Sequence, residues 1–250
     1  MLSKAVVKYI KSLQLKKYRT QHRAFVVEGG KSVLELLKSG FETEYLFVTE
    51  PFYRQHGHSF PENIALDVVT EDDLVKAGTF SSNNAALAVA RMRERPPLRV
   101  APDELAIALD DIRDPGNLGT IVRIADWYGI QKIICSETCA DFYNPKVIAA
   151  SMGSFTRVQV HYLDLAVWLQ QHRASHAIYG ASLAGENLHA MHLKPEGIVV
   201  LGNEASGLRP EVAAQVNQLI KIPAFGTAES LNVATAAAII IDNFRRHTGQ

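Results

Sequence analysis

Three stretches of the sequence place polar side chains directly after an apolar run, where they could build one binding site. DPGNLGTIVR contains Asn117 and Arg123, LGNEASGL contains Glu204, and ESLNVA contains Ser230 and Asn232. Amide, carboxylate and hydroxyl groups orient a ligand, and an arginine can hold a phosphate through two parallel hydrogen bonds. Three such stretches predict one composite site for a phosphate-bearing ligand.

Two of these side chains also have a plain structural explanation that the sequence leaves open. Asn117 is well placed to cap the N-terminus of a helix expected over 117–129. Glu204 could likewise cap a helix that begins near Arg209. Arg123 lies beside the apolar stripe of its helix, from which it could reach over the preceding loop.

The elements that must position these residues alternate regularly in the second part of the chain. Apolar runs indicate strands, and amphipathic patterns between most of them indicate helices. The strands are expected over 105–111, 132–135, 157–162, 177–182, 197–202 and 219–223, and the helices over 117–129, 145–153, 165–173, 210–217 and 231–246. This alternation predicts an α/β fold whose parallel sheet is covered on both faces. Ligands bind at the carboxyl ends of such strands, where the three stretches lie.

A smaller α/β domain is expected in front of this sheet. Strands over 24–29, 44–49 and 86–91 and a helix over 30–40 precede RMRERPPLRVAPDE, a segment rich in proline and arginine that reads as a linker. We therefore expect the domains to span 1–95 and 104–250, with the linker at 96–103.

Charge is balanced over the chain but unevenly spread along it. The 26 basic and 26 acidic residues cancel, yet residues 1–39 hold nine Lys and Arg against two acids. A solvated helix face explains part of this clustering, and contact with a polyanion such as nucleic acid explains the rest.

Several classes of protein and site are excluded by composition and spacing. No window approaches the roughly 20 apolar residues of a membrane span, and no signal-peptide core precedes the first domain, so the protein is expected in the cytoplasm. Cys135 and Cys139 have no further cysteines to complete a zinc site, and the nine histidines form no ligand frame, so no metal is expected.

Two enzyme classes are disfavoured by the details of the loops. GNEASG is not the GxGxxG turn of a dinucleotide-binding fold, and no ribose-binding acid follows at the required spacing. Ser230 is not part of a GxSxG elbow and has no histidine nearby, which argues against a hydrolase.

Taken together, the three stretches resemble the motifs of a known family. DPGNLGTIVR, LGNEASGL and IPAFGTAESLNVATAAAI, in this order, look like motifs one, two and three of the SpoU (TrmH-like) branch of the SPOUT RNA methyltransferases. The basic front segment is similar to the L30e-like substrate-binding domain that precedes the catalytic domain in many members.

The resemblance implies a fold, a cofactor, an activity and an assembly. The catalytic domain would be an α/β sheet with a C-terminal trefoil knot, a rare exception to unknotted topology. It would methylate a ribose 2′-hydroxyl of structured RNA, either rRNA or tRNA, as a homodimer. S-adenosylmethionine (AdoMet) would be bound by Ala181, Ser182, Leu183, Leu201, Gly202, Asn203, Glu204, Ile222, Pro223, Ala224, Phe225, Leu231, Asn232 and Val233.

The resemblance implies catalytic roles for the polar residues of the three motifs. A guanidinium keeps its proton at neutral pH, so Arg123 is expected to grip the phosphate of the target nucleotide and stabilise an incipient alkoxide rather than act as a base. Glu204 is expected to orient Arg123 by ion pairing. Ser230 and Asn232 are expected to position the ribose and the loop, with Asn117 in the motif-one role.

The partner follows from the basic front segment. Contacts to RNA are expected from Lys16, Lys17, Arg19, Arg23 and Lys31. The alternative is a knotted RNA-binding protein without catalysis, which would keep this segment but would have lost Asn117, Arg123 or Asn232. All three are present, and the only departures from the family pattern that we note, such as Ala234, affect packing more than chemistry.

Overall fold

The structure is a computed structural model that describes residues 2–94 and 96–246, and these residues divide into two compact units. Residues 2–94 and 141–156 form the first unit, and residues 96–140 and 157–246 form the second. The segment 141–156 follows a strand of the second unit in sequence but makes its contacts within the first. Sequence analysis had assigned this segment to the second domain, because nothing in its composition distinguishes it from its neighbours.

The first unit is a four-stranded sheet with helices. Its helices are α1 (Lys4–Ser12), α2 (Lys16–His22), α3 (Gly30–Leu37), α4 (Glu50–His56), α5 (Glu71–Ala77) and α7 (Pro145–Ser151), with short 3₁₀ turns at Gly57–Ser59 and Ser154–Thr156. Its strands are β1 (Ala24–Glu28), β2 (Thr43–Thr49), β3 (Leu66–Val69) and β4 (Ala86–Arg91), in the order β1-β4-β2-β3. The strands β1 and β2 run antiparallel to β4, and β3 runs parallel to β2.

The helices of the first unit are stabilised by an apolar core and by local caps. Ile10 and Leu13 from the α1 region and Leu74 from α5 pack against Val26 and Phe47 of the sheet. Thr70 and the carboxylate of Asp73 form a reciprocal capping box that sets where α5 begins.

Arg19 requires a correction to the expected RNA contacts. Its side chain is 2% exposed, and all its donors serve the fold. Nε and Nη2 donate to Asp141 Oδ2 at 3.0 and 2.5 Å, and Nη1 donates to the carbonyls of Leu13 and Gln14 at 2.9 and 2.8 Å. A buried guanidinium with these partners cannot also contact a phosphate, so Arg19 is a structural residue.

The second unit contains a six-stranded sheet. Its strands are β5 (Leu105–Leu109), β6 (Lys132–Ser136), β7 (Gln159–Leu163), β8 (Ile178–Asn187), β9 (Gly197–Leu201) and β10 (Gln218–Lys221). Its helices are α6 (Pro115–Trp127), α8 (Leu165–His172), α9 (Pro210–Ala213) and α10 (Val233–Arg245), with a 3₁₀ turn at Leu188–Ala190.

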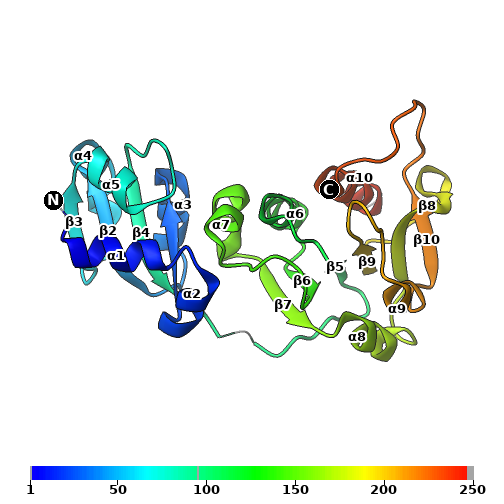
Figure 1. Ribbon diagram of the computed structural model, residues 1–250. Helices are drawn as coiled ribbons and strands as arrows, with labels where there is room; N and C mark the ends of the chain where they lie inside the picture. Colours follow the sequence, from blue (N-terminus) through cyan, green and yellow to red (C-terminus); the bar gives the residue numbers. More distant parts are fainter. Residues whose placement is uncertain (1, 95, 247–250) are drawn as a thin grey trace. The chain divides into compact units, whose positions relative to one another are not determined.

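All neighbouring strands of this sheet are parallel, in the order β10-β8-β9-β5-β6-β7, which confirms the predicted parallel α/β fold. Helices α6 and α10 lie side by side over one face, and α8 and α9 cover the other (Figure 1). Alternate residues of β5 point to opposite faces, so Ala106 and Ala108 meet Trp168 and Leu169 of α8 in a buried core. None of the helices within 2–94 and 96–246 is long and apolar enough to cross a membrane.

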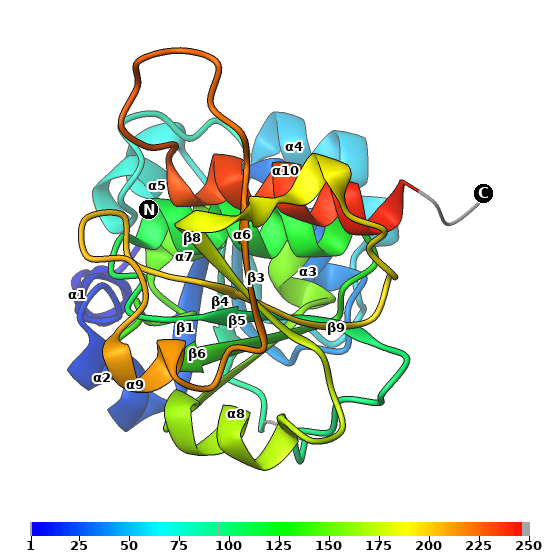
Figure 2. The same cartoon turned by 90° about the vertical axis from the view of Figure 1, so that its right-hand side faces the viewer.

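The connection between β10 and α10 differs from the other connections of the second unit. It runs from residue 222 to residue 232 without regular structure and stands away from the unit as a long loop, orange in Figure 2. Long irregular connections in compact domains usually carry function. This loop contains the third of the polar stretches identified above.

Candidate active site

The first loop of the site begins where β5 ends and leads into α6. Asp114 caps the helix, because its Oδ1 accepts the backbone N–H of Asn117 at 2.8 Å and Pro115 occupies the first helical position. The alternative explanation of Asn117 as the helix cap is therefore wrong. Its side chain is left for other contacts.

The second loop follows β9 and closes on itself. The backbone N–H groups of Asn203 and Gly207 each donate to the other's carbonyl, at 3.0 and 2.9 Å. Gly202 lies against the far end of this loop, where an added Cβ would be 2.4 Å from the carbonyl carbon of Gly207. Glu204 stands exposed at the tip. The helix α9 has Arg209 at its N-cap position without a side-chain cap, so Glu204 does not serve as a cap there.

The third loop ends in a cap that also faces the first two loops. Asn232 is the N-cap of α10, since its Oδ1 accepts the backbone N–H groups of Ala234 and Thr235 at 2.9 and 3.3 Å. With its side-chain oxygen engaged, the amide of Asn232 donates to Asn117 Oδ1 at 2.9 Å. This donation fixes the orientation of the Asn117 amide as well.

The three loops meet at Asn117. Its Nδ2 donates to Glu204 Oε1, while its Oδ1 accepts from Asn232. These contacts join residues 87 and 115 positions apart in the sequence. The convergence of the three stretches, the geometric premise of a composite site, is thereby confirmed.

Arg123 lies on the same helix as Asn117 but has a different environment. Its side chain is exposed and has no hydrogen bond or ion pair to the residues that the structure describes. The expected ion pair between Arg123 and Glu204 is not formed within the described chain, where the Glu204 carboxylate accepts from Asn117. Ser230 is exposed in the long loop, where the described part of the chain gives it no polar partner.

Three of the four segments that the resemblance assigns to AdoMet carry a large apolar side chain turned to solvent. Leu183 in β8 is 73% exposed, and Phe225 and Leu231 in the loop between β10 and α10 are 94% and 46% exposed. Exposed apolar groups gathered on ligand-facing loops are typical of a binding surface. The adenosine and methionine parts of AdoMet carry apolar area that would cover these side chains, and the backbone of the closed loops would bind its polar groups. The residues present therefore fit this cofactor.

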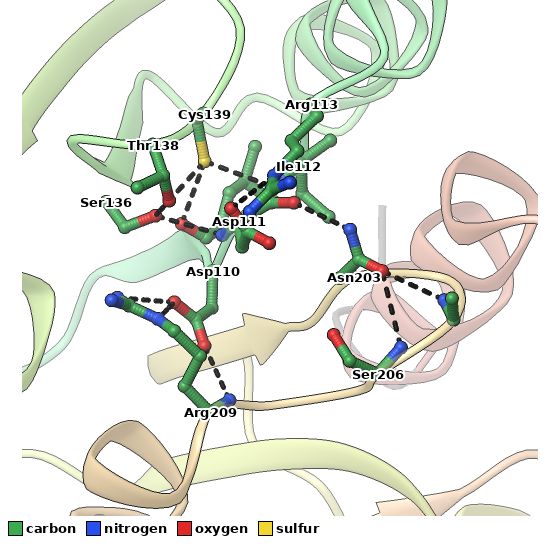
Figure 3. A network of polar contacts seen from close by, with 12 residues as sticks. Asp110, Asp111, Ile112, Arg113, Ser136, Thr138, Cys139, Asn203, Ser206 and Arg209 are labelled. Atoms are coloured by element: carbon green, nitrogen blue, oxygen red, sulfur yellow. Dashed lines mark hydrogen bonds and ion pairs between the residues drawn. The ribbon is translucent and has the colours of Figure 1, made fainter.

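The residues that sequence analysis missed lie just behind the loops (Figure 3). Asp110 pairs with Arg209, and Asp111 contacts Asn203 and Ser136. An acidic pair at the end of an apolar strand is a weak signal of such a role. The partners are 25 to 99 residues away, which no local pattern indicates.

Neither cysteine forms a disulfide, and among residues 2–94 and 96–246 no three His, Cys, Asp or Glu side chains are grouped to hold a metal. Cys139 lies behind the first loop. A hydrogen bond from Cys135 lowers the pKa of its thiol to about 7, against the opposing effect of burial and with help from Ser136 and the N–H of Ile112.

Comparison with known proteins relates both units to described families. Residues 104–242 match the SpoU rRNA Methylase family, and residues 4–88 match the MRM3-like substrate binding domain. A Bacillus subtilis protein named 23S rRNA (guanosine(2553)-2′-O)-methyltransferase RlmP is 29% identical over 242 residues, which are 96% of this chain and 95% of that protein.

Solved structures resemble the whole chain. One from Porphyromonas gingivalis, described as a member of the TrmH family of RNA methyltransferases, is 37% identical with a TM-score of 0.88, covering 98% of this chain and 99% of the other. An AdoMet-bound rRNA methyltransferase from Sinorhizobium meliloti is 29% identical with a TM-score of 0.87, covering 100% and 97%.

Proposed function

Because this chain belongs to the SpoU rRNA methylase family, we propose that it transfers the methyl group of AdoMet to a ribose 2′-hydroxyl of ribosomal RNA. One observation carries the proposal: Asn117, Glu204 and Asn232 come from three loops and form a continuous chain of hydrogen bonds. The Bacillus subtilis relative, which matches over nearly its whole length, favours rRNA over tRNA as the substrate.

The cofactor would be held by the four segments 181–183, 201–204, 222–225 and 231–233. When bound, it supplies an electrophilic methyl carbon on a sulfonium. The exposed side chains of Leu183 and Phe225 would cover its apolar parts, and the backbone of the Gly202 loop would bind its polar groups.

The residues of the site must make a weak nucleophile reactive. A ribose hydroxyl loses its proton reluctantly, so attack needs alignment and stabilisation of the developing negative charge. We assign that stabilisation to Arg123, whose exposed guanidinium has no partner in the described chain and is free to hold the phosphate of the target nucleotide. The proton would leave through this phosphate or through water.

The amide and carboxylate groups have a positioning role in this scheme. Asn117 is held from one side by Asn232 and gives its own N–H to Glu204. The carboxylate of Glu204 keeps its second oxygen for a donor on the substrate or cofactor. Ser230, exposed in the long loop, would contact the ribose.

The first unit would supply contacts to the RNA backbone. Lys16, Lys17 and Lys31 are exposed on α2 and α3, and Arg23, also exposed, makes a 3.7 Å ion pair with the exposed Glu94. An exposed pair of this kind is weak, so Arg23 remains available for a phosphate. The match of residues 4–88 to a substrate binding domain supports this assignment.

Three further properties of the family belong to the proposal. We expect a homodimer, in support of which Trp127 at the end of α6 is 83% exposed. We expect the second unit to be knotted, and Gly185 supports close threading, since an added Cβ would lie 2.5 Å from the backbone nitrogen of Ile220. We also expect the protein in the cytoplasm, where cysteines such as Cys135 persist without forming disulfides.

Mapping of ribose methylation tests the proposed function and names the nucleotide. Total rRNA and tRNA from a strain lacking the protein would be digested and compared with wild type by mass spectrometry. We expect one 2′-O-methylated rRNA nucleotide to disappear, and to return on incubation with the purified protein and AdoMet. Loss of a tRNA methylation instead would contradict the choice of rRNA, and no change in either would contradict the activity. Calorimetric binding of NAD but not AdoMet would contradict the class of enzyme.

A further inference from the structure

The loop that presents Glu204 is tied at both ends to Asp110 and Asp111, two consecutive residues that directly follow β5. Its first tie is a side-chain contact, in which Asn203 Nδ2 donates to the carbonyl of Asp111 at 3.0 Å. Its second tie is the contact of Arg209 with Asp110 (Figure 3). Both acceptors stand at the carboxyl end of β5, immediately before the first loop of the site.

The second tie is an ion pair with two hydrogen bonds. Asp110 is completely buried, its Oδ1 accepts from Nε of Arg209 at 2.7 Å, and Nη2 of the same guanidinium lies 2.7 Å from that oxygen. Its Oδ2 accepts the backbone N–H of the same residue at 2.8 Å. One carboxylate therefore fixes both the side chain and the backbone at the end of the loop, an arrangement stronger than a single ion pair.

The first tie rests on an unusual backbone. Asp111 has φ of +59°, in the left-handed region that non-glycine residues seldom adopt. Its N–H donates to Ser136 Oγ at 2.9 Å, and Arg113 Nε donates to its carboxylate at 2.9 Å. These contacts hold the carbonyl of Asp111 toward Asn203.

The ties matter because the other hydrogen bonds that the structure describes for residues 203–207 join residues of the loop itself, apart from the contact of Glu204 with Asn117. Residues 204–207 are exposed and contribute nothing to the apolar core. An exposed loop without buried side chains has low local stability, unless its ends are fixed. The position of the Glu204 carboxylate against Asn117 therefore depends on the contacts at Asn203 and Arg209.

We propose that Arg209 and Asp110 are positioning residues for methyl transfer, which hold the Glu204 loop so that its carboxylate meets Asn117. This role rests on the proposed function and adds a structural cause for the geometry of its site. Arg209 contacts no reacting group. It acts through Glu204, and its loss should matter only while the Glu204 carboxylate is present.

A double-mutant cycle on the full-length protein tests this dependence. Steady-state methyl transfer to rRNA would be measured for Arg209→Gln, Glu204→Gln and the double variant. We expect each single change to lower kcat/KM by about tenfold or more, and the double variant to be no slower than the slower single variant. Arg209→Lys, which keeps the charge near Asp110, should recover part of the loss.

The matched control removes the other partner of the same guanidinium. Glu211 is exposed and lies 3.3 Å from Nη1 of Arg209, so Glu211→Gln should leave kcat/KM unchanged. Losses from Arg209→Gln and Glu204→Gln that multiply in the double variant would overturn the proposal, as would unchanged kcat/KM in Arg209→Gln. Failure of the wild-type protein to methylate rRNA would instead overturn the proposed function.

Discussion

Two arginines, one in each unit, show how differently the fold uses the same side chain. Arg19 is 2% exposed and donates to Asp141 and to two backbone carbonyls. Arg123 is exposed and has no polar partner in the described chain. The fold therefore uses the donors of Arg19 to hold Asp141 and two carbonyls, whereas the donors of Arg123 have no partner among the described residues.

The role of an arginine therefore depends on whether its N–H groups already donate to other groups of the fold. A guanidinium has five N–H groups, and one that satisfies them internally is costly to remove but cannot bind a ligand. One that leaves them open contributes little to stability and is available for recognition. Substitutions at the two positions should consequently separate stability from activity.

The largest effect on stability is expected at Arg19. In Arg19→Ala the Asp141 carboxylate loses its cationic partner and two backbone carbonyls lose their donors. The free energy of unfolding should therefore fall by about 3–5 kcal/mol. Denaturant unfolding of Arg19→Ala beside Lys17→Ala, an exposed cation on the same helix, measures this. Equal free energies of unfolding in the two variants would contradict the structural role of Arg19.

The largest effect on activity is expected at Arg123. Loss of a group that stabilises a developing charge should lower kcat by about 10²–10³-fold in Arg123→Ala, while the unfolding free energy and AdoMet binding stay near wild type. Single-turnover kinetics and calorimetry give these quantities. Arg173→Ala, an exposed arginine at the end of α8, is the control. Wild-type turnover in Arg123→Ala would remove the role we assign.

A smaller effect is expected from pH, at another group whose hydrogen bonds are used within the fold. Hydrogen bonding from Cys135, opposed by burial, places the pKa of Cys139 at about 7, against an ordinary 9.0. The folded state therefore favours the thiolate, and stability should rise between pH 7 and 9 by on the order of 2 kcal/mol and be lost as pH falls through 7. Unfolding of Cys139→Ser over the same range should lack this rise, and a rise of equal size in the variant would contradict the assignment.

The smallest effect is expected at the exposed lysines of α2. Lys16→Ala combined with Lys17→Ala should weaken RNA binding several-fold and reduce the slope of log affinity against log salt by about 1.4, as two lost phosphate contacts require on single strands. Filter binding at several salt concentrations measures the slope. An unchanged slope would mean that these lysines form only a solvated face.

Much of the second unit could be predicted from its apolar pattern. Buried strands such as Gly197–Leu201 read as continuous apolar runs, and the helices between them follow a 3.6-residue period. The parallel sheet then places the ends of β5 and β9 at one edge, which explains why the first two loops could be expected to meet. The grouping of residues 141–156 with the first unit could not be predicted, since it depends on contacts such as Arg19 with Asp141.

The site was predictable in its polar residues and less so in their partners. The Asp-Pro pair at residues 114 and 115 is a recognisable start of a helix, and it indicates Asp114 as the cap, which leaves the side chain of Asn117 for the site. The contact of Arg209 with Asp110 carries no such local signal, because it joins residues 99 positions apart. A helix cap can be predicted from neighbouring residues, but a contact between residues far apart in the sequence can be identified only in the folded structure.

Hydrogen exchange with and without AdoMet tests most directly that loops far apart in sequence form one cofactor site. We expect slower exchange over the same range of AdoMet concentration in all four segments, 181–183, 201–204, 222–225 and 231–233. Slower exchange in only one of them, or in none while AdoMet binds elsewhere, would contradict this expectation.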